Sequence, residues 1–131
     1  MIHLGKILGF FVYPVLLLIT HVFLILFGLY RIIPELDIIV HFLGGVAIGY
    51  TFILIIGHFE KEGFIKISSR VVPVVSLVAF AAVLWEIFEL FLTYLTGMRF
   101  VGDFYDTSLD LFFGILGGVF ITFFKGIVAV K

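Results

Sequence analysis

Three pairs of ionisable side chains in this sequence are spaced so that each pair shares one face of a helix. The pairs are Asp37 with His41, Glu86 with Glu89, and Asp106 with Asp110. Residues three or four positions apart lie one above the other on an α-helix, so three helices could direct all six groups at one point. Carboxylates with few nitrogen ligands suit Mg²⁺ or Mn²⁺, and the histidine also admits Zn²⁺ or Fe²⁺. We therefore predict a divalent-metal site formed by Asp37, His41, Glu86, Glu89, Asp103, Asp106 and Asp110.

Glu86 and Glu89 are the most informative of these residues, because they lie inside a long apolar segment. A charged side chain at the centre of a membrane helix costs about 2.5–3.5 kcal/mol even on the most lenient scale. Two neighbouring carboxylates cost more unless one is protonated or a cation lies between them. We expect both glutamates and His41 to take part directly in chemistry. The alternative is a pair of glutamic acids hydrogen-bonded to a neighbouring helix.

Helix capping offers a simpler explanation for some of the aspartates. Asp37 follows Pro34 near a predicted helix start, where the helix dipole favours a carboxylate. Asp106 has the character of an N-cap residue, and Thr107 with Asp110 resembles a capping box. For Asp106 considered alone, capping is favoured over metal binding.

The remaining histidines are weaker candidates. His21 lies in the middle of the first apolar segment, where a hydrogen bond that serves packing is the favoured role. His3 and His58 lie at segment ends, and we expect both to be solvated. Trp85 is expected to line the mouth of the site or to anchor its helix at the membrane surface.

Composition indicates an integral membrane protein. Of the 131 residues, 63% are hydrophobic and 13% are charged, whereas soluble domains carry about 25% charged residues. The net charge of −1 gives no electrostatic reason to expect nucleic-acid binding. The absence of cysteine excludes disulfides, thiolate metal sites and cysteine nucleophiles.

The apolar segments predict an all-α, four-transmembrane-helix bundle that forms a single domain over residues 1–131. A spanning helix needs about 20 apolar residues, and the stretches over 7–30, 36–57, 71–96 and 107–128 satisfy this length. The first stretch is too long for a signal-peptide core and lacks a cleavage site after it, so we expect a retained helix. The acidic and histidine residues then gather near one membrane face.

Lysine and arginine counts predict the orientation in the cell membrane. With four spans, the two ends and the middle connection share one side, and they hold six of the eight basic residues. Basic residues favour the cytoplasmic side, so both termini are expected in the cytoplasm. The acidic pocket then faces outward.

Glycines at four-residue spacing indicate close helix packing. Gly45 and Gly49 form one such pair, and Gly114 and Gly118 form another. Small residues at this spacing let membrane helices approach closely. The contacts could lie within the bundle or between subunits, so a homodimer through the glycine faces is one expectation. The surrounding membrane lipids are the other expected partners.

Three short patterns resemble a known group of membrane proteins. They are Asp37-x-x-x-His41-x-x-Gly44-Gly45, Trp85-Glu86-x-x-Glu89 and Asp103-x-x-Asp106-x-x-x-Asp110. Together they resemble the YjdF-like family of small bacterial and archaeal membrane proteins and, more distantly, VanZ-like proteins. The resemblance covers residues 34–118 and implies a minimal core of a larger membrane fold. The VanZ-like link implies a role in glycopeptide tolerance or envelope lipids.

Three functions agree with these patterns. The first is a divalent-metal-dependent membrane hydrolase or phosphotransferase acting on a lipid or lipid-linked phosphate. The second is a proton- or cation-coupled transporter, because buried Glu and His residues mark ion paths. The third is a non-catalytic assembly protein whose polar cluster holds the bundle together.

Overall fold

The described part of the chain is mostly helical. The computed structural model describes residues 4–97, 100 and 102–129. Its helices are α1 (Leu4–Gly9), α2 (Val12–Leu26), α3 (Leu29–Ile32), α4 (Glu35–Lys61), α5 (Val71–Thr96) and α6 (Phe104–Ala129). No strand occurs within the described residues, which confirms the predicted all-α membrane bundle. Three helices, α4, α5 and α6, are each long and apolar enough to cross a bilayer.

The predicted span over 7–30 is not one continuous helix, which corrects the sequence prediction. Pro14 explains the first break, because its ring would collide with the carbonyl four positions earlier, at Phe10, and α1 ends at Gly9. The second break lies at Gly28, whose φ of 64° is left-handed and favours glycine. The helix between them, α2, has 15 residues. At about 1.5 Å per residue it is about 22 Å long, shorter than the roughly 30 Å hydrocarbon core.

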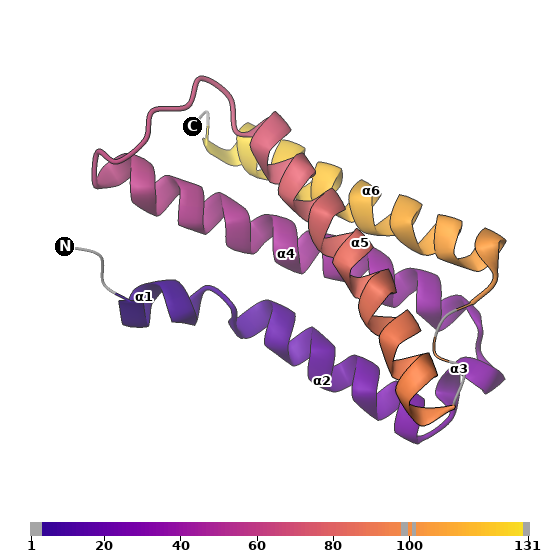
Figure 1. The fold of residues 1–131 in the computed structure, drawn as a ribbon. Coiled ribbons are helices and arrows are strands. Elements are labelled where there is room, and N and C mark those ends of the chain that lie inside the picture. Colours follow the sequence, from indigo (N-terminus) through magenta and orange to yellow (C-terminus); the bar gives the residue numbers. More distant parts are fainter. Residues whose placement is uncertain (1–3, 98–99, 101, 130–131) are drawn as a thin grey trace.

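The later spans agree better with the sequence. Helix α5 matches its predicted bounds, α4 continues past the predicted end at 57 as far as Lys61, and α6 begins at Phe104 rather than at 107. Figure 1 shows α4 and α6 lying side by side, with α5 crossing over them and α2 running along the other flank of α4. The start of α1, the α4–α5 connection and the end of α6 lie at one end of the bundle, while α3 lies at the other.

Glycine makes the contact between α4 and α6. A Cβ added at Gly45 would collide with the carbonyl of Gly114, and one added at Gly117 would collide with the carbonyl of Phe42. The two backbones therefore touch where no side chain separates them. Both glycine faces are used within the chain, and a homodimer through them stays a prediction.

A small apolar core occupies the half of the bundle nearer the α4–α5 connection. It contains Ile53, Ile56, Val74, Val78 and Ile121. Many other large apolar side chains are exposed, as expected for helices that face lipid. The opposite half of the bundle holds the buried ionisable groups His21, Glu86, Glu89 and Asp110, whereas Thr51, His58 and Thr122 are buried nearer the apolar core.

Candidate functional site

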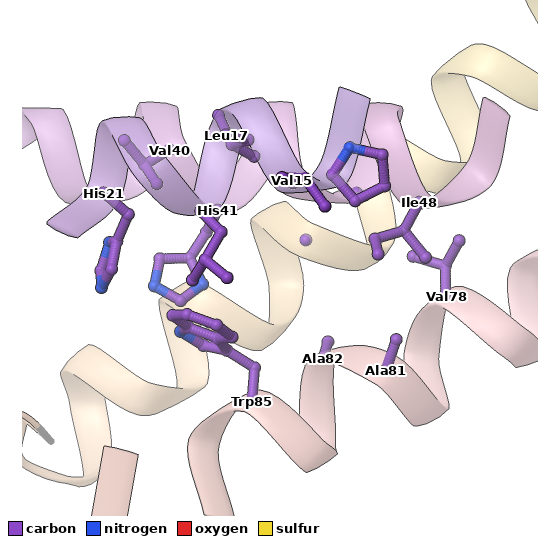
Figure 2. Close-up of a pocket in the computed structure, with 15 residues that line it drawn as sticks. Val15, Leu17, His21, Val40, His41, Ile48, Val78, Ala81, Ala82 and Trp85 are labelled. Atoms are coloured by element: carbon purple, nitrogen blue, oxygen red, sulfur yellow. The ribbon is translucent and has the colours of Figure 1, made fainter. Parts of the chain in front are cut away.

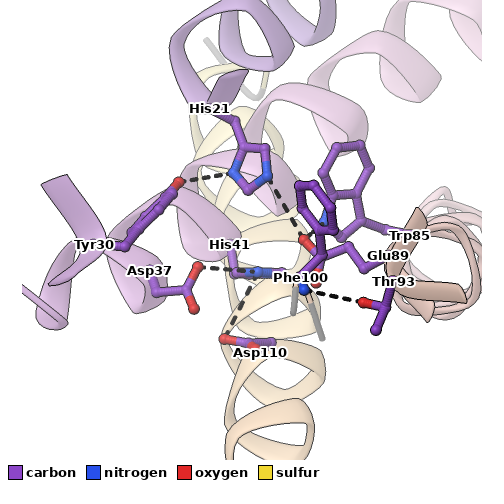
Figure 3. Close-up of polar contacts among 9 residues, drawn as sticks. All are labelled: His21, Tyr30, Asp37, His41, Trp85, Glu89, Thr93, Phe100 and Asp110. Atoms are coloured by element: carbon purple, nitrogen blue, oxygen red, sulfur yellow. Dashed lines mark hydrogen bonds and ion pairs between the residues drawn. The ribbon is translucent and has the colours of Figure 1, made fainter. Parts of the chain in front are cut away.

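Asp37, His41 and Asp110 form a compact cluster where α4 meets α6. The Nε2 atom of His41 lies 3.6 Å from Asp37 Oδ1 and 3.7 Å from Asp110 Oδ1. One ligand atom from each residue lies within 4.8 Å of the other two. Figure 3 shows the imidazole between the two carboxylates. The i, i+4 spacing brings Asp37 and His41 together on α4, and the glycine contact brings Asp110 to them from α6.

The environment of this cluster is asymmetric. The side chain of Asp110 is 5% exposed, and that of Asp37 is 32% exposed. The Oδ1 atom of Asp110 accepts no hydrogen bond from any residue that the structure describes. A buried carboxylate oxygen without a donor is costly unless a cation or a proton satisfies it. The arrangement therefore suits a bound cation reached from the side of Asp37.

Glu89 belongs to a second polar group, on the α2 side of the bundle. Its Oε1 atom accepts a hydrogen bond of 2.8 Å from Trp85 Nε1 and lies 3.6 Å from His21 Nε2. The other imidazole nitrogen, Nδ1, lies 2.7 Å from the Tyr30 hydroxyl. Figure 3 shows this chain of contacts running from α5 through α2 to α3. The expected packing role of His21 is thus extended, because His21 links a tyrosine to a buried carboxylate.

Tyr30 is the residue that sequence reasoning missed. It lies nine positions after His21, too far to share a helix face, and it reaches the imidazole only because the chain turns at Gly28 into α3. The available signal was the polar His21 at the same estimated membrane depth as the glutamates. A buried histidine there needs partners on both nitrogens.

Glu86 is buried on α5, and its carboxylate has no hydrogen bond of standard geometry within the described part of the chain. Its side chain lies on α5, and the residue is 9% exposed. Neither carboxylate oxygen accepts a hydrogen bond with standard geometry from the described residues, although the Thr107 side chain lies toward it. The carboxylate of Glu86 is too far from Asp37, His41 and Asp110 to join them in the group of candidate metal ligands.

Asp103 and Asp106 occupy the rim of the site. Asp103 Oδ1 accepts hydrogen bonds of 3.0 Å from the backbone N–H groups of Tyr105 and Asp106. Asp103 is therefore the N-cap of α6, and the predicted cap at Asp106 and the Thr107–Asp110 capping box are wrong. Asp106 is exposed and lines a recess of about 550 Å³ together with Tyr30, Arg31 and Asp103. Neither residue joins the cluster of ligand atoms found among the described residues.

A second cavity extends from the cluster toward the apolar core of the bundle. It has a volume of about 260 Å³ and is bounded by α2, α4, α5 and Gly114 of α6. His21, His41 and Trp85 form one end, and aliphatic side chains form the other (Figure 2). Trp85 therefore does not simply anchor its helix, because its indole both lines this cavity and holds Glu89.

His58 and His3 are the two histidines that we expected to be solvated. His58 is 6% exposed, and its Nε2 atom has no hydrogen-bond partner in the described part of the chain. The expectation that His58 is solvated is therefore wrong. It packs edge-to-face against Phe10 of the chain between α1 and α2, which covers it. His3 lies outside the described residues.

Comparison with known proteins identifies the family and goes no further. No curated protein and no solved structure matches the chain. The match to a protein family extends over residues 7–130 and so includes every candidate site residue. The family carries the description "Predicted membrane protein (DUF2238)", and the chain belongs to this family.

Proposed function

We propose that this protein is a membrane-embedded enzyme that uses a divalent cation bound by Asp37, His41 and Asp110 to act on the phosphate of a lipid. The observation that carries the proposal is the Asp110 carboxylate, which is buried, accepts no hydrogen bond at Oδ1 within the described residues, and faces His41 Nε2. The position of these residues inside a membrane bundle favours a lipid as the substrate. The distant resemblance of the sequence motifs to VanZ-like proteins would also imply a role in envelope lipids.

The ligand set narrows the choice of metal. Two carboxylates and one imidazole suit Mn²⁺ well, and they also accommodate Mg²⁺, Zn²⁺ or Fe²⁺. Three protein ligands leave coordination positions open, as catalytic metal sites do. A divalent cation in this position supplies polarisation of a phosphoryl oxygen and activation of water.

The second polar group supplies a candidate acid or base. The His21 imidazole is held between the Tyr30 hydroxyl and the Glu89 carboxylate, and Trp85 fixes the carboxylate from its other side. A carboxylate that orients an imidazole is the arrangement used in general acid–base catalysis. Tyr30 also lines the open recess. In the series of contacts from Trp85 through Glu89 and His21 to Tyr30, Tyr30 is therefore the residue nearest the outside. In this proposal Tyr30, through His21, exchanges a proton with the head group.

Metal binding to purified protein is the decisive test. The protein is extracted in mild detergent, stripped with a chelator and titrated with Mn²⁺ by calorimetry, beside Asp110→Asn and Asp103→Asn. Asp103→Asn is a matched control, because asparagine also caps helices and position 103 lies outside the cluster. We expect one Mn²⁺ per chain in the parent and the control and none in Asp110→Asn. Failure of the parent to bind Mn²⁺, Mg²⁺ or Zn²⁺ would overturn the proposal.

Activity is measured next with phosphatidic acid in mixed micelles. We expect release of inorganic phosphate that depends on Mn²⁺ and is lost in Asp110→Asn. Loss of the same activity in His21→Gln, with Mn²⁺ binding retained, would separate the acid–base role from metal binding.

Cation-coupled transport is a second candidate, favoured by one observation. His58 is buried near the opposite end of α4, and its Nε2 atom has no hydrogen-bond partner among the described residues, so a polar group also exists in the other half of the bundle. Flux of protons or Mn²⁺ into proteoliposomes, lost in both His58→Gln and Asp110→Asn, would favour the transporter over the enzyme.

A further inference from the structure

The cavity beside the three-residue cluster is graded from polar to apolar along its length. Figure 2 shows His21, His41 and Trp85 together at one end, and Val15, Ile48 and Val78 at the other. A site with imidazoles at one end and aliphatic side chains at the other matches an amphiphile rather than a purely polar or purely apolar molecule.

Small residues create the space. The walls include Gly44 and Gly45 on α4, Ala81 and Ala82 on α5, and Gly114 on α6. A Cβ added at Gly44 would meet only the Leu17 side chain, at 3.5 Å, so the space beside α4 is open. An enclosed apolar cavity of about 150 Å³, smaller than this one, is known to take up apolar ligands.

The cavity has a flank through which a hydrocarbon chain can enter. Both α2 and α5 line it. In the described part of the chain the two helices touch through His21, Trp85 and Glu89 at the polar end, while their backbones come close at few positions. In a bilayer the surroundings of this flank are lipid chains. A lipid can therefore reach the cavity sideways while its head group stays at the polar end.

We propose that this cavity binds one hydrocarbon chain of a phosphate-bearing lipid, with the head group placed at Asp37, His41 and Asp110. The placement of the head group rests on the proposed metal-dependent function, whereas the binding of the chain does not. The polar end of the cavity contains His41, which is a member of the metal cluster. Site and cavity therefore share the His41 side chain, which brings the cavity next to the cluster.

The protein contains its own reporter for this proposal, because Trp85 is its single tryptophan and lines the cavity. Bromine atoms quench tryptophan fluorescence on contact. The protein in a steroid-based detergent, whose rigid tail fits a narrow cavity poorly, is titrated with a fatty alcohol brominated on its chain, and then with brominated phosphatidic acid. We expect saturable quenching of Trp85 by both probes.

Variants that fill the cavity make the test specific. Ala81→Phe and Gly44→Leu are expected to weaken binding of the alcohol and so to raise its half-saturation concentration at least tenfold. Ala79→Phe adds the same volume on the same helix at a position that does not line the cavity, and it should leave saturation unchanged. Circular dichroism identifies any variant that fails to fold. If one of the two cavity-filling variants does not fold, the other can still be compared with the parent.

The outcomes separate the two proposals. Quenching that does not saturate, or that saturates equally in the parent and in both folded fillers, overturns the chain-binding proposal and leaves the metal site untouched. Alcohol quenching that persists in Asp110→Asn, in which Mn²⁺ binding is expected to be lost, supports chain binding independently of the metal. Retained Mn²⁺ binding in Ala81→Phe shows that the filler acts on the cavity alone.

Discussion

The imidazole of His41 on α4 and the carboxylate of Asp110 on α6 face each other across a helix contact made of glycine. Their Nε2 and Oδ1 atoms are 3.7 Å apart, and both side chains are less than one-tenth exposed. The contact beneath them places the Gly45 and Gly114 backbones directly against each other. The distance between the two functional groups is thus set by helix packing four residues further along each helix.

Enlarging Gly45 should therefore disturb the site from a distance. A Cβ at this position collides with the Gly114 carbonyl, and backbone cannot move aside as a side chain can. We expect Gly45→Ala to lower stability by about 1–3 kcal/mol, the usual range for overpacking, and to weaken Mn²⁺ binding. Thermal unfolding and calorimetry in detergent measure both effects. Gly44→Ala is the control, because its Cβ would meet only a leucine methyl at an ordinary distance, and equal effects of the two changes would contradict the packing argument.

The two aspartates of the cluster should differ in their contribution to metal binding. Asp110 is 5% exposed and Asp37 is 32% exposed, so water can replace the lost oxygen more easily at position 37. Loss of an outer-shell partner alone weakens metal binding about 10–100-fold. We expect Asp110→Asn to reach or exceed the upper end of that range, and Asp37→Asn to cost less. A larger loss for Asp37→Asn in the same Mn²⁺ titration would reverse the assignment.

Sequence patterns predicted the local parts of the site because helical periodicity fixes them. The spacing of Asp37 and His41 places both on one face of α4, and the depth of Glu86 and Glu89 follows from the length of α5. The position of Asp103 also carries a usable signal that the prediction overlooked. Asp103 and Asp106 are separated by two residues, and the first caps the backbone N–H of the second.

The relations between helices could not be predicted in the same way. Nothing in the spacing says that Asp110 meets His41 while Glu89 meets His21, because this depends on which glycine faces touch. The link from Tyr30 to His21 depends on a left-handed turn at Gly28, which the uninterrupted apolar pattern conceals. The residues of the predicted seven-residue metal site therefore lie in four places. Asp37, His41 and Asp110 form the cluster, Glu89 pairs with His21, Glu86 lies apart from both, and Asp103 and Asp106 lie on the rim.

The hydrogen bond between Tyr30 and His21 predicts a specific tautomer. If the hydroxyl donates to Nδ1, the neutral imidazole carries its proton on Nε2, toward Glu89. We expect Tyr30→Phe to cost about 0.5–1.5 kcal/mol of stability, as for loss of one neutral hydrogen bond, and to shift the ¹⁵N resonance of His21 Nδ1. Tyr94→Phe is the control, because Tyr94 is 85% exposed. An unchanged His21 spectrum in Tyr30→Phe would rule out the bond.

The predicted orientation can be tested by labelling single introduced cysteines, because the sequence has no cysteine of its own that would react. Ser68 lies in the α4–α5 connection, and Ile32 lies in α3 at the other end of the bundle; both are exposed. Because five of the six basic residues that the structure describes belong to the end that contains Ser68, and only Arg31 lies at the other, this end should be cytoplasmic. An impermeant maleimide should therefore label Ile32→Cys in intact cells and Ser68→Cys only in inverted vesicles. The opposite pattern would place the site on the cytoplasmic face.

Glu86 and Glu89 should respond oppositely to the same isosteric change. Glu89 accepts a hydrogen bond from Trp85 and lies beside His21. The amide oxygen of Glu89→Gln can still accept from Trp85, but the carboxylate facing His21 is lost, so we expect a destabilisation of about 0.5–1.5 kcal/mol. Glu86 accepts no standard hydrogen bond from the described residues, so removing its charge relieves an unpaired buried group. We expect Glu86→Gln to raise the unfolding temperature while lowering phosphatase activity.

A higher unfolding temperature together with lower activity in Glu86→Gln would indicate that the Glu86 carboxylate serves activity at a cost in stability. Glu86→Gln that unfolds at a lower temperature than the parent would show instead that Glu86 has a stabilising partner, and would assign it to the structure of the bundle. Glu62→Gln on the α4–α5 connection, outside the polar half of the bundle, controls for the loss of one negative charge. The comparison therefore decides between a catalytic and a structural carboxylate at the centre of α5.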